Sequence, residues 1–342
     1  MYTFESDYTE GAHEKILQKL METNYEQLPG YGNDHYCESA AEKIRSCCGK
    51  PEAKVHFLTG GTQSNAVVIR TMLRAYQGVV SAHTGHINCH EAGAVEYAGC
   101  KVLSLPATDG KLQAEDLRQL LVRFYEDGSH DHMVFPGMVY ISHPTEYGTL
   151  YSKQELKEIY GICKEYEMPL FVDGARLGYG IMSYHTDVTM EDLANLCDVF
   201  YIGGTKVGAL CGEAVVFTNP AFYPEHFVTM VKQHGAMVAK GRLHGIQFDV
   251  LFTDGLYFEI ARHGIDMAEK LKKLFCDKGY QLYLDSPTNQ QFVILDHDTI
   301  ARLEKSVGFS VWEDYDADHK VVRFATSWAT TEESLKELEQ LL

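Results

Sequence analysis

Strand-like and helix-like segments alternate along the chain from about residue 53 to about residue 218. Short apolar runs predict strands, and the segments with helical spacing between them predict helices. Strands that alternate with helices imply a mostly parallel sheet covered on both faces. The predicted strands are 55–58, 79–81, 101–105, 138–142, 170–172, 199–202 and 214–217, and the predicted helices are 62–76, 113–125 and 152–166.

The pattern changes from about residue 241. A long helical stretch is predicted from Leu243 past Asp254 toward Lys272. Strand-like runs at 281–284, 291–295 and 321–327 follow, and a last helix begins at about Thr331. These segments predict a smaller α+β domain with an antiparallel sheet. We therefore divide the chain into an N-terminal arm (1–10), a large domain (11–240) and a small C-terminal domain (241–342).

The composition excludes several classes of protein. A net charge of −18 argues against a nucleic-acid or anionic-membrane partner, because either would need a basic face. No stretch approaches the roughly 18 apolar residues of a membrane helix, and the first residues lack the features of a signal peptide. Nine cysteines without a framework spacing predict reduced thiols in a cytoplasmic protein.

A lysine and an aspartate each follow a predicted strand. Lys206 lies among Gly203, Gly204 and Gly208, and Asp173 ends the run that begins at Leu170. Ligands bind at the carboxyl ends of the strands in such sheets. This pair is what an enzyme that uses pyridoxal phosphate (PLP) needs, since the lysine forms the Schiff base and the aspartate keeps the pyridine nitrogen protonated. The alternative for Lys206 is an exposed loop lysine. The alternative for Asp173 is a structural Asp–Arg pair or an Asp-Gly turn.

A glycine turn joins the strand at 55–58 to the next helix. Gly60, Gly61 and Thr62 would place unpaired backbone N–H groups and a positive dipole end near a ligand, which suits a phosphate. The Thr62 or Ser64 hydroxyl would be a further donor. The turn is not a Walker A loop, because no Gly-Lys-Ser/Thr follows at the required spacing. The alternative is an ordinary turn with Thr62 as the N-cap.

Histidines and one arginine complete the set of candidates. His83, His86, His90 and Glu91 match no closed zinc pattern, so we favour a cofactor contact over a metal and predict no metal site. One of these imidazoles would stack on a flat ring or act as an acid or base near neutral pH. Arg323, in a strand-like run, would bind a substrate carboxylate or pair with Asp or Glu.

Together these segments resemble the threonine aldolase / aromatic amino acid β-eliminating lyase family. That family belongs to the aspartate-aminotransferase-like (type I) PLP enzymes, an α/β fold with a smaller C-terminal α+β domain. The resemblance covers nearly the whole chain, and it lies in the order and spacing of its motifs. The matching segments are Ser6-Asp7, Gly11-Ala-His13, Tyr31-Gly-Asn-Asp34, Thr59–Asn65, His86–Gly93, Pro144–Thr149, Asp173–Arg176, Gly203–Lys206, Glu213–Phe217, Lys240–Leu243 and Arg323–Trp328.

The resemblance implies roles in cofactor binding. Lys206 would carry pyridoxal 5'-phosphate as a Schiff base, and Asp173 would pair with the pyridine nitrogen. Gly61 and Thr62 would hold the phosphate. His86 would stack on the ring and help with proton transfer.

Further roles follow from the same resemblance. Ser6, Arg176 and Arg323 would bind the substrate carboxylate, and Arg176 would also contact the cofactor. Arg242 would reach the phosphate from a neighbouring subunit, in a homodimer or homotetramer. Some branches of the family have a second active-site histidine where this chain has Glu146, so the base at the β-hydroxyl is His86, Glu146 or a bound water.

The implied reaction is the retro-aldol cleavage of L-3-hydroxy-α-amino acids, such as L-threonine or L-allo-threonine, to glycine and an aldehyde. This makes the chain a PLP-dependent aldehyde-lyase of the low-specificity L-threonine aldolase type, with a small amino acid as its substrate. The alternatives are another PLP reaction on the same scaffold, β-elimination or transamination, and a non-catalytic protein that keeps the fold and binds PLP.

Overall fold

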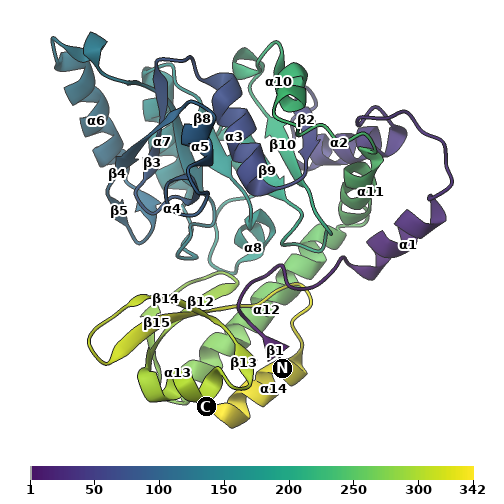
Figure 1. Cartoon of the computed structure of the whole chain (residues 1–342), viewed down its shortest axis with the longest axis vertical. Coiled ribbons are helices and arrows are strands. Elements are labelled where there is room, and N and C mark those ends of the chain that lie inside the picture. Colours follow the sequence, from purple (N-terminus) through teal and green to yellow (C-terminus); the bar gives the residue numbers. More distant parts are fainter. Residues whose placement is uncertain (1) are drawn as a thin grey trace.

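A seven-stranded sheet forms the centre of the larger part of the molecule (Figure 1). The computed structural model describes residues 2–342. Strand β10 runs antiparallel to both of its neighbours, and the other strands run parallel to one another, so the predicted mostly parallel sheet is confirmed. In spatial order the strands are β2 (Lys54–Leu58), β10 (Glu213–Phe217), β9 (Val199–Gly203), β8 (Leu170–Asp173), β7 (Phe135–Ser142), β3 (Gln77–Ala82) and β4 (Lys101–Leu105).

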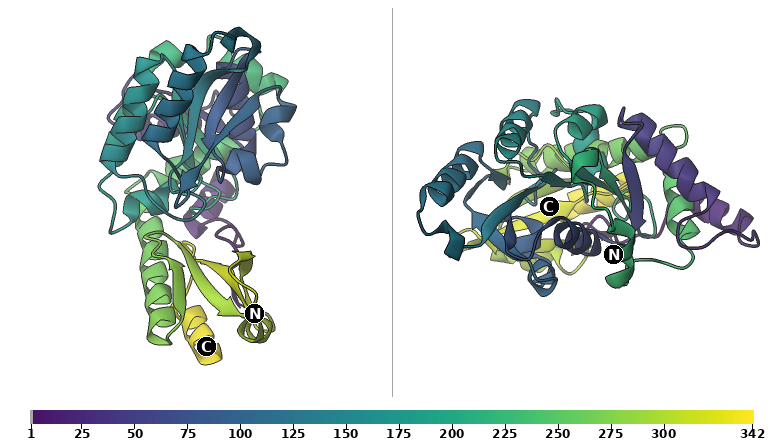
Figure 2. Two further views of the ribbon diagram at one scale, coloured as in Figure 1. Left: turned by 90° about the vertical axis from the view of Figure 1, so that its left-hand side faces the viewer. Right: turned by 90° about the horizontal axis from the view of Figure 1, so that it is seen from above.

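Both faces of this sheet are buried, and side chains along each strand alternate between two cores. In β7, Val139 and Ile141 join one core, and Met138 and Tyr140 join the other. Helices cover the two faces (Figure 2). One core includes α2 (His35–Cys47), α6 (Ala114–Glu126), α7 (Lys153–Glu165), α9 (Met190–Asn195) and α11 (Arg242–Leu251), and the other includes α3 (Gly61–Met72), α5 (Ala94–Tyr97) and α10 (Phe227–Gln233).

Three strands of the large sheet bring the candidate residues to one edge. Strands β2, β8 and β9 end at Leu58, Asp173 and Gly203. They run in the same direction because β10, between β2 and β9, is antiparallel to both. The glycine turn, Asp173 and the loop of Lys206 therefore lie at the same edge, as the alternation predicted.

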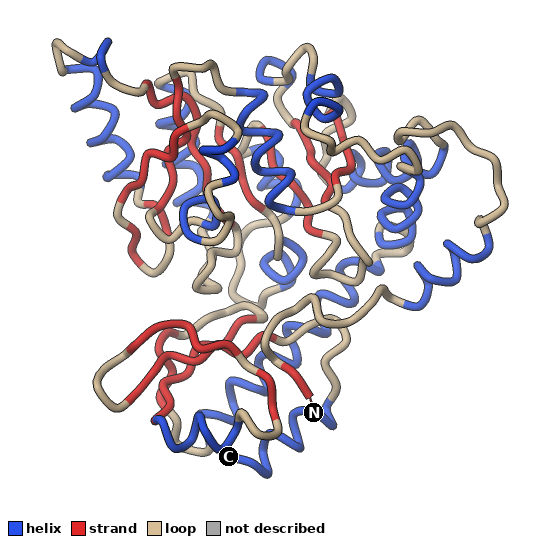
Figure 3. Tube along the Cα trace, in the orientation of Figure 1, coloured by secondary structure: helices blue, strands red, loops and turns tan. Residues whose placement is uncertain are grey.

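A smaller sheet lies below the large one, and Figure 3 shows the two as separate groups of strands. Its antiparallel strands are, in spatial order, β11 (Gln281–Leu284), β12 (Gln290–Asp296), β15 (His319–Ala325) and β14 (Ser310–Asp314). Its core joins Phe324 to Phe275 of α12 (Leu256–Asp277), Ile300 of α13 (His297–Leu303) and Leu338 of α14 (Glu332–Leu341). The predicted small α+β domain is confirmed.

The N-terminal arm belongs structurally to this small domain. Strand β1 (Tyr2–Thr3) pairs in parallel with β13 (Val307–Gly308), and Phe4 is buried in the same core as Phe324. The chain then crosses to the large domain and enters α1 (Glu14–Glu22). Met1 lies outside the described residues.

The single long helix predicted from Leu243 to Lys272 is wrong. The structure has α11 and α12, separated at Phe252–Gly255. Asp254 and Gly255 adopt left-handed φ angles of 52° and 74°, which end one helix before the next begins. Helix α11 packs against α2 and α1, whereas α12 contacts both α8 (Leu177–Met182) and β12. The domain boundary at residue 240 stays a prediction.

Short elements complete the large domain. They are α4 (His86–Cys89) and the small hairpin of β5 (Ala107–Thr108) and β6 (Lys111–Leu112). Across residues 2–342, no helix combines the length and apolar character that crossing a bilayer requires.

Candidate active site at the carboxyl edge of the large sheet

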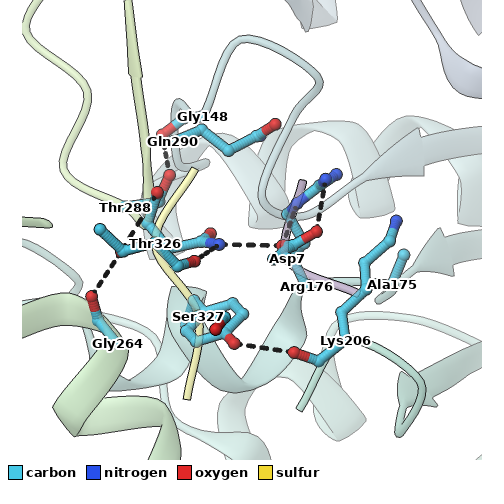
Figure 4. Close-up of polar contacts among 12 residues, drawn as sticks. Asp7, Gly148, Ala175, Arg176, Lys206, Gly264, Thr288, Gln290, Thr326 and Ser327 are labelled. Atoms are coloured by element: carbon cyan, nitrogen blue, oxygen red, sulfur yellow. Dashed lines mark hydrogen bonds and ion pairs between the residues drawn. The ribbon is translucent and has the colours of Figure 1, made fainter. Parts of the chain in front are cut away.

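Lys206 lies in a tight loop between β9 and β10. Gly203 has no room for a side chain, because a Cβ there would come 2.1 Å from the carbonyl oxygen of Ala175. The backbone of the loop is fixed by the Tyr179 hydroxyl, which donates to the carbonyl oxygen of Lys206 at 2.7 Å. The lysine is therefore held in place through its main chain, and its half-buried side chain extends into the site (Figure 4).

The amine of Lys206 has no direct partner. Within residues 2–342, its Nζ makes no hydrogen bond or ion pair, and it lies 5.8 Å from the centroid of the Tyr8 ring. Burial, and secondly the positive charge of Arg176, lower the pKa of Lys206, although Asp7, Asp173 and Glu213 oppose this. A lowered pKa increases the fraction of neutral amine, which is the nucleophilic form.

Asp173 is buried at the end of β8 with its carboxylate fully hydrogen-bonded. Oδ2 accepts from the Tyr140 hydroxyl at 2.6 Å and from Asn65 at 3.0 Å. Oδ1 accepts from the Tyr201 hydroxyl at 2.5 Å and from the backbone N–H of Ala175 at 2.9 Å. Burial alone would raise the pKa of Asp173, but the charge of His86 and these hydrogen bonds outweigh it and leave the pKa lowered. The carboxylate is therefore ionised at neutral pH.

A second buried carboxylate connects Asp173 to His86. Glu91 Oε1 accepts from the Asn65 amide and lies 2.8 Å from His86 Nδ1. Asn65 therefore bridges two carboxylates, and Glu91 fixes the orientation of the imidazole. The ligand atoms of His86, Glu91 and Asp173 lie within 4.8 Å of one another, a spacing that a metal ion could use. The oxygen atoms of Asp173 are already occupied by four donors, so we read the cluster as a hydrogen-bond network.

Glu146 lies in the loop that follows β7, next to His86. Its Oε1 accepts from the backbone N–H of His86 at 2.8 Å and from the Ser142 hydroxyl at 2.6 Å. Burial raises the pKa of Glu146, and the hydrogen bond from Ser142 only partly opposes this. The structure therefore brings together His86 and Glu146, the two side chains that the sequence offered as bases.

The glycine turn starts α3 without a side-chain cap. Gly60 is the N-cap residue, and no side chain hydrogen-bonds to the first N–H groups of the helix. Thr62 lies inside α3, with its side chain exposed, so it is not the N-cap that the alternative interpretation proposed. Ser64 donates its hydroxyl back to the carbonyl oxygen of Gly60 at 2.9 Å and is not available as a further donor. The free backbone donors at Gly61 and Thr62 remain suited to an anion.

Arg176 is paired within the protein. Its Nε and Nη2 donate to the two carboxylate oxygens of Asp7, at 2.7 Å and 2.9 Å (Figure 4). Asn289 also donates to Asp7, at 2.8 Å. The arm residue Asp7 therefore occupies two of the five N–H donors of the guanidinium that we predicted for the substrate carboxylate. Ser6, another predicted contact, is buried next to Asp7.

Arg323 differs from Arg176 because no carboxylate within residues 2–342 forms an ion pair with it. Neutral oxygens of Gln290, Glu5 and Ser310 accept its Nη protons, and its buried Nε has no partner. Burial, and secondly Arg176, lower its pKa to about 10, so it stays cationic at neutral pH. A half-buried cation without a counter-ion favours an anionic ligand.

Arg242 is not directed at Lys206 in this chain. Its guanidinium donates to the backbone carbonyls of Glu26, at 2.8 Å, and Thr23. It also lines a hollow of about 690 Å³ between the end of α1 and the start of α11. Its contact with the phosphate of a neighbouring subunit stays a prediction.

Sequence reasoning missed several partners of the site. Tyr140 and Tyr201 could have been found from strand alternation, because they fall on the same face of the sheet as Phe171 and Asp173. Asn65 and Glu91 lie inside motifs that we quoted without assigning them a role. Asp7 gave no local signal, because only the path of the arm brings it to Arg176.

The donors and acceptors of the site fit PLP. They offer an amine without a partner at Lys206, a buried carboxylate at Asp173 and a helix N-terminus without a cap at Gly60. Buried oxygens of Asn65 and Glu91 also lack partners. A ring N–H at Asp173 would replace one of its four donors, and the tyrosine hydroxyls can rotate away.

Comparisons with known proteins agree with this geometry. The chain is similar to the solved structure of a Leishmania major threonine aldolase, with 41% identity and a TM-score of 0.96 over 100% of this chain and 98% of that one. It is 28% identical to a low specificity L-threonine aldolase of Pseudomonas over 98% of this chain and 95% of the relative. Aspartate aminotransferase from Thermus thermophilus, 15% identical, shares the fold, with a TM-score of 0.70 over 100% and 90% of the two chains.

The fold and the site thus define a PLP-dependent enzyme of the aspartate-aminotransferase-like, type I class. Within that class, the sequence profile described as beta-eliminating lyase matches residues 3–297. The chain belongs to this family of PLP-dependent lyases.

Proposed function

We propose that this chain is an aldehyde-lyase that cleaves L-3-hydroxy-α-amino acids, such as L-threonine or L-allo-threonine, to glycine and an aldehyde. The observation that carries the proposal is the position of Lys206, whose amine has no partner, at the same sheet edge as the ionised Asp173. The printed names of the Leishmania structure and the Pseudomonas relative support this choice of reaction.

The large domain supplies the cofactor contacts in this proposal. Lys206 would hold PLP through its amine as a Schiff base, Asp173 would accept the pyridine N–H, and the backbone donors of Gly61 and Thr62 would hold the phosphate. His86, with its orientation fixed by Glu91, would lie against the ring. Bound PLP supplies an electron sink next to the α-carbon of the substrate.

Arg323 binds the substrate carboxylate, with Ser6 next to it. Because Asp7 already engages two donors of Arg176, that residue contributes mainly by holding the arm and adding positive charge. Fixing the carboxylate fixes the rotation about the substrate Cα, and that rotation decides which bond aligns with the electron sink.

Glu146 is our first choice for the base that takes the β-hydroxyl proton. Burial raises its pKa toward the range in which a carboxylate is an effective base near neutral pH. The hydrogen bonds from Ser142 and the His86 backbone hold Oε1, which leaves Oε2 for the substrate. His86 and a water held between the two side chains are the other candidates.

We further propose a cytoplasmic homodimer or homotetramer in which Arg242 reaches the phosphate of a neighbouring subunit. The hollow next to Arg242 leaves room for a second chain. The nine cysteines are unpaired, which suits a reducing compartment.

Replacing the lysine tests the proposed function. Lys206→Ala should abolish the release of acetaldehyde from L-threonine in the presence of PLP, and it should remove the visible absorbance of the lysine-bound cofactor. An unchanged melting temperature of the apoprotein would show that the variant still folds. Retained turnover would refute the assignment, and ammonia with a keto acid in place of glycine would show that the wild-type enzyme catalyses β-elimination instead.

A further inference from the structure

Arg323 needs a partner for its guanidinium face as well as for its N–H groups. The edges of the guanidinium donate to neutral oxygens of Gln290, Glu5 and Ser310. The face lies over the indole of Trp312, with Cζ 5.1 Å from the ring centroid. An indole face attracts a cation through its quadrupole at this distance, and it does so without supplying an anion.

Trp312 also contacts the loops of the large domain. It lies on β14, an edge strand of the small sheet, and its ring is 5.8 Å from His90 and 5.7 Å from Tyr147. His90 directly follows the short helix that starts at His86, and Tyr147 directly follows Glu146. Phe292 packs on the same indole at 5.4 Å. The half-buried Trp312 thus connects Arg323 of the small domain to the two segments that carry the candidate bases, His86 and Glu146.

Gln290 provides a second link between the same two groups. Its Oε1 accepts from Arg323 Nη1 at 3.1 Å, and its Nε2 donates to the carbonyl oxygen of Glu146 at 3.5 Å. The distance between the carboxylate-binding group and the loop of Glu146 is therefore set by a polar contact on one side and an aromatic contact on the other.

We propose that Trp312 is a positioning residue that holds the Arg323 guanidinium ready for the substrate carboxylate. The indole takes the place that a carboxylate counter-ion would occupy in an ordinary buried arginine. A carboxylate at this position would compete with the substrate, as Asp7 competes for Arg176. The inference rests on the proposed function, in which Arg323 binds the carboxylate.

If Trp312 positions Arg323, its loss should act selectively on ligands with a carboxylate, whereas a purely structural residue would affect all ligands alike. Trp312 should affect ligands that have a carboxylate and spare amines that lack one. Glycine and methylamine form such a pair, since both have an amine that would displace Lys206 from the cofactor and only glycine has a carboxylate. Equilibrium titration of the holoenzyme, followed by its visible spectrum, measures the affinity for each.

We expect Trp312→Ala to weaken the binding of glycine about tenfold and to change the binding of methylamine less than about twofold. Trp312→Phe, which keeps an aromatic face, should stay within about threefold of the wild type for glycine. With L-threonine, Trp312→Ala should raise KM more than it lowers kcat. Equal losses for glycine and methylamine, or no loss for either, would overturn the proposal, as would an equal loss in the phenylalanine variant.

Two controls separate this inference from the proposed function. Arg323→Met should weaken glycine binding by itself, and combining it with Trp312→Ala should add little. If Arg323→Met leaves glycine binding intact, Arg323 does not bind the carboxylate and the proposed function loses that contact. If Arg323→Met weakens glycine binding and Trp312→Ala leaves it intact, only the role of the indole is refuted. Tyr184→Ala is a matched variant, because it removes another aromatic ring under an arginine, Arg262 at 4.2 Å, and should leave glycine binding unchanged.

Discussion

The site around Asp173 and the site around Arg323 each withdraw a formal charge at least partly from solvent, and the two sites satisfy it in different ways. Asp173 receives four hydrogen bonds, including one from each of two tyrosine hydroxyls. Arg323 has neutral acceptors, an indole and an Nε without a partner. The first site satisfies its charge with donors of the protein itself, and the second offers its cation no anionic partner within residues 2–342. A resident cofactor suits the first, and a substrate that comes and goes suits the second.

Removing the charge of Asp173 should have the largest effect on catalysis. Asp173→Asn replaces a carboxylate with a neutral amide, whose NH₂ would face a hydroxyl donor of Tyr140 or Tyr201. Since a neutral group cannot stabilise a protonated pyridine, kcat should fall about 10²- to 10³-fold, by analogy with the loss of other stabilising groups in active sites. Steady-state kinetics with L-threonine measures this, and a fall in kcat of less than tenfold would contradict it.

Removing the charge of Arg323 should affect substrate binding instead. Arg323→Met loses a charged hydrogen-bonding group, which typically contributes about 1.5–3 kcal/mol, so KM for L-threonine should rise roughly 10- to 100-fold. The loss of kcat should be smaller than in Asp173→Asn. If Arg323→Met lowered kcat and left KM constant, the assignment of Asp173 to the cofactor and of Arg323 to the substrate would be contradicted.

A third variant tests the protonation of Glu213, another buried carboxyl near Asp173. Glu213 is buried at the start of β10, where it accepts from the Gly204 N–H at 3.1 Å and the Thr205 hydroxyl at 2.9 Å. Burial chiefly, and also the nearby charge of Asp173, raise the pKa of Glu213 to about 8. The environment therefore separates the pKa values of two neighbouring carboxyls, as in many sites with divided roles.

The sign of the stability effect follows from this raised pKa. The folded protein keeps a proton on Glu213 that the unfolded chain releases near pH 4.5, so wild-type stability falls as the pH rises from about 4.5 to about 8. Glu213→Gln cannot lose this proton. Relative to the wild type, it should gain roughly 1–3 kcal/mol between pH 5 and pH 8, measured by denaturant unfolding. A difference independent of pH would contradict the assigned protonation.

The parts of the site that the sequence predicted are those set by local pattern. Alternating segments place Asp173 and Lys206 at strand ends, and parallel strands share an edge, so their proximity was predictable. The interruption at Asp254 and Gly255 was missed because helical spacing continues on both sides of it. The pairing of Asp7 with Arg176 was beyond prediction, because no local pattern reports a contact between residues 169 positions apart.

The route of the N-terminal arm has a consequence for the order of assembly during synthesis. Tyr2 and Thr3 are synthesised about 300 residues before Val307 and Gly308, with which they pair. Closing a loop of some 300 residues is slow relative to local folding. Arg176 must therefore wait for Asp7 until the carboxyl-terminal sheet exists, so a nascent chain that stops short of residue 307 should have a folded large sheet and no working catalytic centre.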